Sequence, residues 1–343
     1  MKENSAFRVR QQPRLEWGAA GPLLAEASRC AGDPLPLLPI LRAAPARTPV
    51  PGSGNTLALW EFLAALAAED LTAARAVEPH LDAAAILAQA GVELPAGTTW
   101  GVFAAESSGT RLDAKPNNDG GAWLLSGTKP WCSLAAQLDH AVVTAHVEGG
   151  RRAFAVDLTQ PAVTVELAEW ISRGLAAVPS GPVSFQQAAG TPVGGTDWYL
   201  HRPGFAWGGI GVAACWFGGA VGLFRTLRAA ATSRTPDQLA LAWLGEADRL
   251  LAAGADVLAA AAGAVDDGAA GAVQAHRVRG QIAAVCSRML EICGHALGPA
   301  PMVWDEQHAR RAADLSVYIR QHHAARDDAA LGAIMMEQGE SEW

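Results

Sequence analysis

The spacing of apolar residues changes twice along this 343-residue chain, and these changes constrain the fold more than any other feature. Residues 1–97 hold helical stretches interrupted by prolines, residues 98–202 hold short β-branched runs separated by glycine, proline and aspartate, and residues 203–343 return to helical spacing. The pattern predicts an α+β chain of three domains with these boundaries: N-terminal helices, a middle β domain and a C-terminal helical bundle.

The N-terminal domain is predicted to begin as irregular chain, because prolines break any long helix in residues 1–50. Asn55 is a suitable N-cap for a helix with apolar residues at helical spacing after it. A second helix is predicted over Asp82–Ala90, and Gly91 is a residue type that often ends a helix.

Four β-branched-rich runs predict strands in the middle domain, at residues 141–145, 152–158, 163–167 and 183–186. In the C-terminal domain, Thr235 is predicted to cap a helix with Pro236 in its first turn. The next helix carries one apolar stripe suited to a bundle, formed by Val278, Ile282, Val285, Met289, Ile292 and Ala296. The last helix is predicted over Glu306–Leu331.

The segment Pro203–Phe224 carries no charge and is long enough to cross a membrane. Its many glycines and alanines would let neighbouring helices approach closely, and the rest of the chain has a soluble composition. We interpret it as a buried helix at the centre of a bundle or oligomer rather than a membrane span, and we expect a homo-oligomer, either a dimer or a tetramer.

The composition excludes several classes of protein. Half of the residues are apolar and 17% are charged, which is typical of a globular chain, and a net charge of −8 argues against a nucleic-acid partner. The five cysteines have spacings that fit neither a disulfide framework nor a zinc site, and no other motif predicts a metal. No signal peptide is visible at the N-terminus, so we expect a cytoplasmic protein.

The stretch Gly101–Ser133 carries the strongest functional signal. An apolar run at 100–105 ends in a polar turn that starts with Glu106, a second strand is predicted at 122–125 after a turn at 116–121, and the chain closes on Ser126–Ser133. Two strand ends would then present small hydroxyls, a carboxylate and the indole of Trp131, a combination that suits a flat aromatic ligand with a polar edge. The alternative is a surface hairpin with a half-buried tryptophan.

This stretch resembles the middle domain of the acyl-CoA dehydrogenase superfamily, where a strand ending Thr-Glu-Pro leads through a Gly-Ser turn and a strand to Gly-Thr-Lys-x-Trp-Ile-Ser/Thr. The matching residues, in order, are Glu106, Gly109, Gly127, Thr128, Lys129, Trp131 and Ser133. The resemblance implies that Trp131 and Ser133 lie against the isoalloxazine ring of FAD, with Glu106 in the same site. Ala105 and Ser107 replace the family Thr and Pro, so one usual flavin hydrogen bond is expected to be missing.

The order of the three domains is also similar to that of the family. It implies a β-barrel-like middle domain, a C-terminal four-helix bundle, FAD between the two, and a shortened N-terminal domain. Gly209–Ala214 also fits the dinucleotide pattern G-x-G-x-x-A, but no strand precedes it, so we interpret its glycines as helix-packing residues.

The segment Glu291–Gly298 resembles Gln-x-x-Gly-Gly-x-Gly, which in relatives helps to hold the FAD diphosphate of a neighbouring subunit. The resemblance implies that Gly294 and His295 lie near that diphosphate. Glu291 replaces the family Gln, however, and an acid beside a diphosphate is unfavourable. A plain helix end explains this segment equally well.

The segment His308–Leu315 resembles the Arg-Asp segment before the last family helix. Arg310 and Asp314 are one helical turn apart and Gln321 lies two turns further, so one shared face is predicted. That face would point to the cofactor. An ordinary surface ion pair is the alternative.

Many family members place the catalytic base, a Glu that removes the substrate's α-proton, at the position of residues 318–323. No Glu is present there, and the other family location, near Trp207, is not acidic either. His322 is the nearest candidate base, because imidazole accepts protons near neutral pH. The alternative is a solvated histidine on an exposed helix face.

The resemblance therefore implies an FAD-dependent oxidoreductase that acts on a small molecule. Its reaction would be α,β-dehydrogenation of an acyl thioester, or related flavin chemistry such as that of an oxidase or monooxygenase. The alternative is a catalytically decayed binding or assembly protein. The sequence does not predict the electron acceptor.

Overall fold

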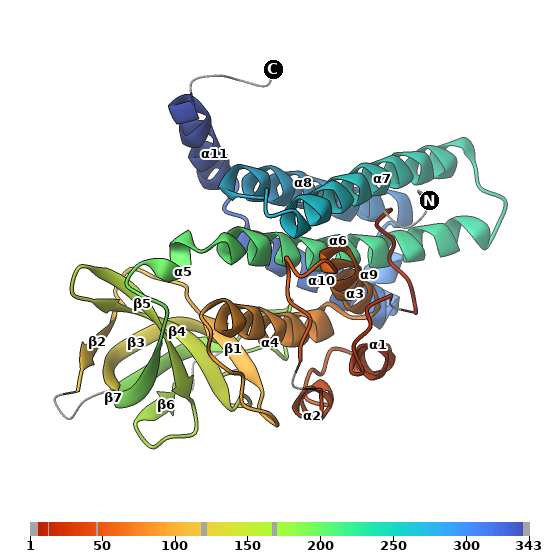
Figure 1. The fold of residues 1–343 in the computed structure, drawn as a ribbon. Helices are drawn as coiled ribbons and strands as arrows, with labels where there is room; N and C mark the ends of the chain where they lie inside the picture. Colours follow the sequence, from red (N-terminus) through yellow and green to blue (C-terminus); the bar gives the residue numbers. More distant parts are fainter. Residues whose placement is uncertain (1–5, 13, 46, 118–121, 167–169, 339–343) are drawn as a thin grey trace.

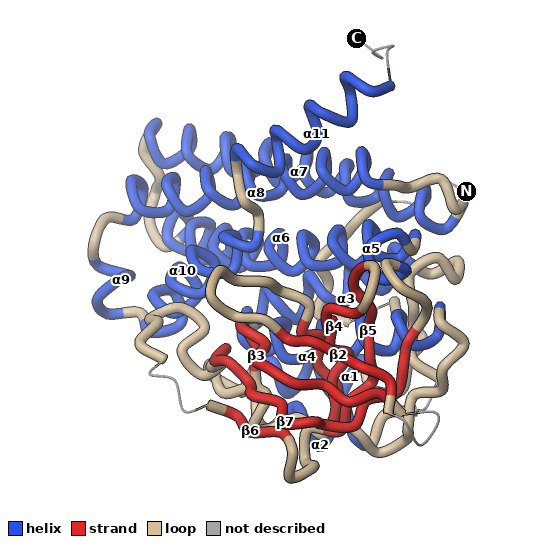
Figure 2. The backbone as a smooth tube through the Cα atoms, turned by 90° about the vertical axis from the view of Figure 1, so that its left-hand side faces the viewer, coloured by secondary structure: helices blue, strands red, loops and turns tan. Residues whose placement is uncertain are grey.

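A computed structural model describes residues 6–12, 14–45, 47–117, 122–166 and 170–338. A β-barrel-like sheet forms one side of the molecule and a helical bundle the other, and α4 (Leu71–Gln89) lies between them (Figure 1). Figure 2 shows the strands gathered at one end, with the long helices of the bundle stacked across the other. The predicted α+β architecture is confirmed.

Two short helices, α1 (Ala20–Ala27) and α2 (Leu37–Arg42), occupy the part of the chain predicted to be irregular. Pro22 and Pro39 each lie in the first turn of their helix, where a backbone N–H has no partner within the helix in any case. The prolines therefore limit helix length without preventing these helices.

The next helix, α3 (Thr56–Glu69), begins where the sequence predicts, but Asn55 does not cap it with its side chain. Asp266 supplies the acceptor instead: its Oδ2 accepts from Thr56 N at 3.1 Å and its Oδ1 from Gly54 N at 3.0 Å. A cap from a residue so distant in the sequence leaves no local pattern.

Helix α4 begins at Leu71, and the predicted start at Asp82 is wrong. Asp70 caps the helix, because its Oδ1 accepts from Thr72 N at 2.9 Å and from Ala73 N at 3.2 Å. Pro79 lies inside the helix and removes one backbone donor, which explains why the sequence pattern divides this element in two.

The sheet closes into a barrel. Its strands are β1 (Trp100–Phe103), β2 (Leu112–Pro116), β3 (Trp123–Ser133), β4 (His140–Val147), β5 (Gly150–Asp157), β6 (Val163–Val165) and β7 (Ser180–Val193). The pairings β4–β2, β2–β3, β3–β7, β7–β5 and β5–β4 return to the starting strand, with β1 added on β4 and β6 on β7. The strands predicted between 141 and 186 correspond to β4–β7, although Leu167 lies outside the described residues.

A hairpin does form within Gly101–Ser133, but its strands are β2 and β3 and not the two runs predicted at 100–105 and 122–125. β1 pairs in parallel with β4, and the antiparallel neighbour of β3 is β2. The sequence does not predict β2 because Asp113 and Lys115 are residue types depleted in strands. The strand predicted at 122–125 extends to Ser133, and the predicted turn at 116–121 lies partly outside the described residues.

The bundle contains α5 (Trp198–His201), α6 (Pro203–Thr232), α7 (Gln238–Asp266), α8 (Ala272–Leu297), α9 (Ala300–Trp304), α10 (Glu306–Tyr318), the 3-10 turn η1 (Ile319–Gln321) and α11 (Ala325–Gln338). By length and composition α6 could cross a membrane, but 72% of its most apolar window is buried inside the protein. It contacts α3, α4, α7, α8 and α10, which makes it the core helix of the bundle.

Two predictions for the bundle are wrong and one is confirmed. Helix α7 starts at Gln238 because Asp237, not Thr235, accepts a hydrogen bond from Ala240 N at 2.8 Å. The last predicted helix is interrupted by η1 and by Ala324, whose φ is +50°. The apolar stripe of α8 is buried as predicted, with Ala296 at its partly exposed end.

Candidate functional site

Trp131 lies in a β-bulge near the end of β3. The register of β3 against β7 shifts between Lys129 and Cys132, so that the intervening Pro130 and Trp131 leave the ladder. Trp131 has a φ of +59° and is 58% exposed. A left-handed backbone at such a side chain costs about 1–3 kcal/mol. We interpret the bulge as the feature that presents the indole to a ligand.

Ser133 connects the end of β3 to the helical layer. It is 9% exposed, and its Oγ accepts a hydrogen bond from Arg75 Nη2 of α4 at 2.9 Å and lies 2.7 Å from Ser180 Oγ. The Arg75 guanidinium in turn lies 5.7 Å from the ring centroid of Tyr318. Arg75 therefore joins the strand that carries Trp131 to the end of α10.

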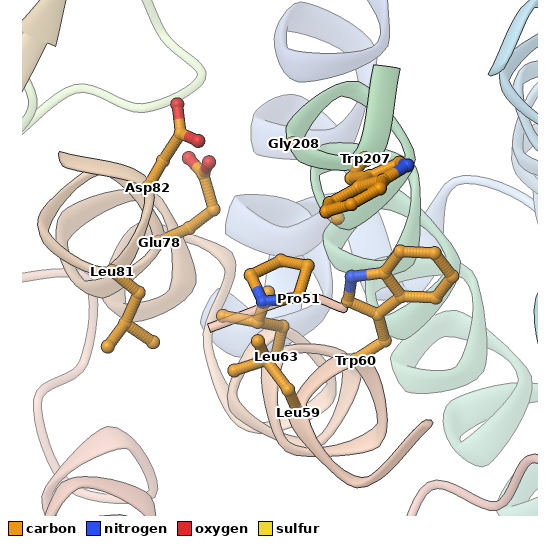
Figure 3. Close-up of a pocket in the computed structure, with 10 residues that line it drawn as sticks. Pro51, Leu59, Trp60, Leu63, Glu78, Leu81, Asp82, Trp207 and Gly208 are labelled. Carbon is orange, nitrogen blue, oxygen red and sulfur yellow. The ribbon is translucent and has the colours of Figure 1, made fainter. Parts of the chain in front are cut away.

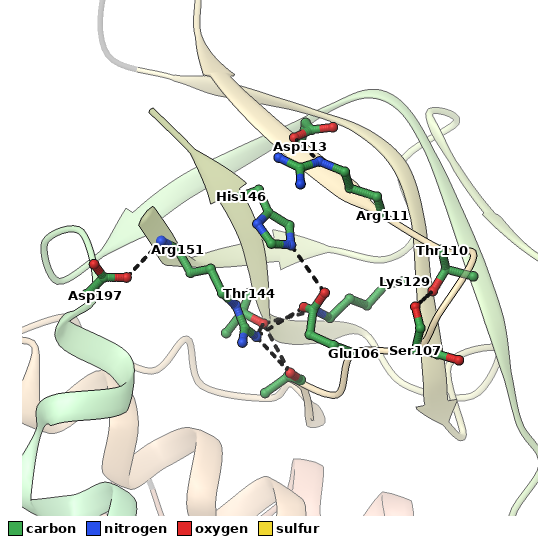
Figure 4. A network of polar contacts seen from close by, with 11 residues as sticks. Glu106, Ser107, Thr110, Arg111, Asp113, Lys129, Thr144, His146, Arg151 and Asp197 are labelled. Atoms are coloured by element: carbon green, nitrogen blue, oxygen red, sulfur yellow. Dashed lines mark hydrogen bonds and ion pairs between the residues drawn. The ribbon is translucent and has the colours of Figure 1, made fainter. Parts of the chain in front are cut away.

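Glu106, in the turn after β1, is held by three basic side chains (Figure 4). Lys129 Nζ lies 2.6 Å from Glu106 Oε1, Arg151 Nη2 lies 3.1 Å from the same oxygen, and His146 Nε2 lies 3.2 Å from Oε2. Burial raises the pKa of Glu106, but the hydrogen bonds from Lys129 and His146 and the charge of Arg151 outweigh it, so that the pKa ends below its usual value. Both carboxylate oxygens are engaged, and Glu106 anchors the turn after β1.

Two carboxylates, which the sequence reasoning missed, share one face of α4 with Arg75. Glu78 follows Arg75 by one turn and Asp82 follows Glu78 by another. The nearest cations are Arg75 Nη1, 4.0 Å from Glu78, and Arg202 Nη2, 3.8 Å from Asp82. The i, i+4 spacing of the two acids was a usable signal, but the division of the helix at Pro79 conceals it.

Burial, and after it the charge of Asp82, raise the pKa of Glu78 to about 8, against the opposing charges of Arg75 and Arg279. Burial likewise raises the pKa of Asp82, and the charge of Arg202 opposes this. A carboxyl group that titrates close to neutral pH is suited to proton transfer.

Glu78 and Asp82 line a pocket between α3, α4 and α6 (Figure 3). The pocket has about 300 Å³ of space, part of it open to solvent, and its other lining residues are Pro51, Leu59, Trp60, Leu63, Leu81, Trp207, Gly208 and Gly211. A Cβ on Gly208 would lie 2.7 Å from Asp82 Oδ1, so the glycine leaves the room that the carboxylate occupies. The pocket is thus apolar apart from two acids and two indoles.

Arg279 of α8 connects this region to the break after α10. Its Nη1 donates to Gly209 O of α6 at 2.7 Å and its Nη2 donates to Gln321 O of η1 at 2.9 Å. Its guanidinium lies 4.7 Å from the ring centroid of Trp216. One side chain therefore fixes three elements around the end of α10.

His322 does not lie on an exposed helix face. The helix ends at Tyr318, and His322 follows η1 with only 9% of its side chain exposed. Its Nε2 is 3.7 Å from Asp327 Oδ2 and makes no hydrogen bond to the described residues. Burial lowers the pKa of His322 while Asp327 opposes the shift, so the imidazole is neutral at pH 7 and can accept a proton.

The shared face predicted for Arg310, Asp314 and Gln321 is not present, because α10 ends before Gln321. Arg310 pairs with Asp70 at 3.4 Å and with Glu306. Asp314 is 1% exposed and accepts from Leu175 N at 2.5 Å, so the alternative of a surface ion pair between Arg310 and Asp314 is also wrong. The side chain of Gln321 is exposed, and only its carbonyl contacts the cluster, through Arg279.

The segment around Gly294 lies on α8, and among the described residues no hydrogen bond, ion pair or ring contact joins it to Trp131 or Ser133. Glu291 pairs with Arg288 at 2.8 Å, and the ring of His295 lies 5.9 Å from that of Trp243. Gly298, with a φ of +65°, is the C-cap of the helix, so the plain helix end is observed.

No family model and no curated protein matches the sequence. Solved structures do match over nearly the whole chain. KijD3, in a complex with FMN and dTDP-3-amino-2,3,6-trideoxy-4-keto-3-methyl-D-glucose, has a TM-score of 0.77 at 19% identity and covers 98% of each chain. Butyryl-CoA dehydrogenase from Megasphaera elsdenii has a TM-score of 0.78 at 16% identity, over 93% of this chain and 98% of its own.

A third similar structure is that of the dibenzothiophene monooxygenase TdsC from Paenibacillus sp. A11-2. Its complex with FMN and indole has a TM-score of 0.75 at 16% identity, over 93% of this chain and 96% of its own. This chain therefore has the acyl-CoA dehydrogenase fold, as the resemblance in the β domain implies. The similar structures include a dehydrogenase and a monooxygenase, and those of KijD3 and TdsC contain FMN.

Proposed function

We propose that this protein is a flavin-dependent monooxygenase that binds FMN against Trp131 and oxygenates a small molecule held between α3, α4 and α6. The observation that carries the proposal is the bulge of β3, which exposes 58% of Trp131 beside the Arg75–Ser133 hydrogen bond. An exposed indole next to fixed hydroxyl and guanidinium groups suits the flat ring and polar edge of a flavin.

The environment of Glu291 favours FMN over the FAD that the sequence resemblance implies. The relatives' segment holds a diphosphate, but here Glu291 is acidic and already paired with Arg288, and His295 packs against Trp243. Among the described residues the cation nearest in sequence to this segment is Arg288, and it already pairs with both Glu246 and Glu291, so it is not free to bind a diphosphate. FMN carries a single phosphate and does not need that contact. The similar KijD3 and TdsC structures contain FMN.

The groups at the end of α10 favour oxygenation over acyl-CoA dehydrogenation. Relatives that dehydrogenate place the base for the substrate's α-carbon on the segment matching Tyr318–His323 or near Trp207. Here the first position supplies a neutral imidazole, His322, and the second has no acid, and the carboxylates of the pocket lie on a different helix, α4. The chemistry that a bound reduced flavin supplies is activation of O₂, with one oxygen atom passed to the substrate and the other released as water. In this scheme Arg75 and Ser133 orient the ring edge, and His322 exchanges protons near it.

The test supplies photoreduced FMN and isotopically labelled O₂ to the purified protein with a panel of small amines, indoles and acyl-CoA thioesters. We expect labelled oxygen in a product of an amine or indole, with unreacted acyl-CoA. Anaerobic reduction of oxidised flavin by an acyl-CoA would show that the protein is a dehydrogenase instead. A protein that takes up neither FMN nor FAD would be the decayed binding protein that the sequence leaves open.

A further inference from the structure

The carboxylates of Glu78 and Asp82 point into the pocket without hydrogen-bond partners. Glu78 is 7% exposed, and among the residues that the structure describes no side chain or backbone N–H donates to either carboxylate. The adjacent guanidinium groups have other partners: Arg75 donates to Ser133 and Arg202 donates to Gln89 at 2.7 Å. Each carboxylate is thus compensated only by a long ion pair, which leaves oxygen lone pairs free to accept hydrogen bonds from a ligand that brings donors.

The other groups that face Glu78 come from every helix packed around it. They are Arg75 and Asp82 on α4, Cys215 on α6, Arg279 on α8 and Tyr318 on α10. Arg279 is already bonded to two carbonyls, and the buried hydroxyl of Tyr318 makes no hydrogen bond to Glu78 in the described part of the chain. The carboxylate oxygens of Glu78 and Asp82 are therefore the groups in the pocket that can accept hydrogen bonds from a ligand.

The remaining walls of the pocket suit a cation with an apolar body. Trp60 and Trp207 lie on one side, Leu81 of α4 lies across from them, and Leu59 and Leu63 lie next to Trp60 on α3 (Figure 3). Indole faces attract ammonium groups, and leucine side chains accept hydrocarbon. An ammonium group also brings three N–H donors, which matches a pair of carboxylates better than the single donor of a hydroxyl.

We propose that this pocket binds the protonated amino group of a small amine with an apolar body, and that Glu78 removes one proton from it. The ligand's role as the substrate rests on the proposed monooxygenase function. Its binding does not. The proton step is an exchange between two groups: R–NH₃⁺ and the Glu78 carboxylate become R–NH₂ and the Glu78 carboxylic acid. The free amine that results has the lone pair that an oxygen-transfer reaction at nitrogen requires.

The raised pKa of Glu78 agrees with this assignment. A carboxyl group with a pKa of about 8 is much closer in pKa to an alkylammonium group than an ordinary glutamate is. A proton can therefore move between Glu78 and the amine at a small cost in free energy. It also predicts a signature of binding. At pH 7 the empty pocket holds Glu78 mainly as the neutral acid, and a bound ammonium group favours the carboxylate, so binding must release a proton.

The experiment is calorimetry on the full-length protein without flavin, with benzylamine and its neutral isostere benzyl alcohol as probes. We expect benzylamine to bind at least about tenfold more tightly at pH 7.5, since a charged partner strengthens each hydrogen bond. Titrations in two buffers of different ionisation enthalpy should show release of about one proton per benzylamine at pH 7 and none with benzyl alcohol. The affinity for benzylamine should rise about tenfold per pH unit between about pH 6 and 8 and then level off.

Variants locate the effect. Glu78→Gln should abolish the proton release and reduce the preference for the amine. Asp82→Asn should weaken binding and reduce the release at pH 7 without abolishing it, because the charge of Asp82 is one of two causes that raise the pKa of Glu78. Glu337→Gln, an exposed acid on α11, is the matched control and should change neither. Equal affinities for the two probes, no binding of benzylamine, or a proton release that survives Glu78→Gln would overturn the proposal.

The wild-type comparison of amine with alcohol remains decisive if Glu78→Gln does not fold. Because these titrations contain no flavin, a negative result leaves the flavin assignment intact. Conversely, if the protein binds benzylamine with proton release but takes up no flavin, the proposal of an amine site stands and the proposed monooxygenase function is refuted.

Discussion

Arg75 and Ser133 join the helical layer to the β-barrel through one hydrogen bond of 2.9 Å, from Arg75 Nη2 to Ser133 Oγ. Arg75 also precedes Glu78 by one helical turn, so the same side chain contacts both the strand that presents Trp131 and the face that lines the pocket. The candidate flavin surface and the candidate substrate pocket are therefore linked by a single residue.

This link should be measurable as a coupling energy. We expect Arg75→Met and Ser133→Ala each to lower the free energy of unfolding by about 1–2 kcal/mol, because each removes a partly buried charged hydrogen bond. The double variant should lose less than the sum, with a coupling of about 0.5–1.5 kcal/mol in chemical denaturation. Strictly additive losses would mean that the two side chains do not stabilise each other.

The cluster at Glu106 predicts an asymmetry between its two main partners. Glu106→Gln leaves the Lys129 ammonium, which is 1% exposed, without its carboxylate, whereas Lys129→Met leaves Glu106 with Arg151 and His146. A buried charge that loses its counter-charge destabilises the fold more than a half-exposed charge that loses one of its partners. Glu106→Gln should therefore be the more destabilising by about 1–2 kcal/mol in urea denaturation. The reverse order would show that Lys129 is neutral in the folded protein.

Asp314 predicts a pH-dependent contribution to stability. Burial raises its pKa to about 6, against the hydrogen bond from Leu175. The folded protein therefore holds the proton of Asp314 more tightly than the unfolded chain does, because an aspartate in the unfolded chain titrates near 4. The contribution of Asp314 to the free energy of unfolding is full below about pH 4 and is lost as the pH rises through about 6.

The measurement is unfolding of wild type and Asp314→Asn between about pH 4 and 7. As the pH rises across this window, the free energy of unfolding of Asp314→Asn should increase by about 2–3 kcal/mol relative to that of wild type, because asparagine carries no charge to bury. Asp139→Asn is the control. Hydrogen bonds from Arg42 and Thr99 overcome burial and lower the pKa of Asp139 to about 2, so its contribution changes below about pH 4 and its difference from wild type should stay nearly constant across this window. A pH-independent difference for Asp314→Asn would contradict the shift.

The oligomer expected from the sequence remains a prediction, and the structure suggests where to test it. Helix α9 exposes Met302, Val303 and Trp304, the last by 86%. Large apolar side chains gathered on one short helix are typical of a subunit contact. Light scattering should give a mass above that of the monomer, and Trp304→Ser should shift the equilibrium towards the monomer. A monomer at every concentration would refute the expectation.

The sequence predicts elements well where one periodic pattern covers the whole element. The stripe of α8 and the strands β4 and β5 are of this kind, whereas the predicted run at 183–186 covers only part of β7. It fails where a distant residue decides the local structure: Asp266 caps α3, and β2 forms a strand only because β3 provides its partner.

The candidate site shows the same division. Trp131 and Ser133 are found from a local motif, and the structure places both at the end of β3, where Ser133 is bonded to Arg75 of α4. Glu78 and Asp82 are missed because Pro79 hides the continuity of their helix, and Arg310 and Gln321 are wrongly grouped because nothing local indicates the break after Tyr318.

The central claim is that the exposed indole of Trp131 is the surface on which a flavin binds, and titration with FMN tests it most directly. The protein is titrated while flavin fluorescence is followed, in wild type, in Trp131→Ala and in Trp123→Ala, a control at the opposite end of the same strand. We predict saturable quenching in wild type, an affinity at least about fivefold weaker in Trp131→Ala, as expected for the loss of about 1 kcal/mol of ring stacking, and little change in folded Trp123→Ala. Equal affinities in the two variants, or no uptake of FMN by wild type, would contradict the account.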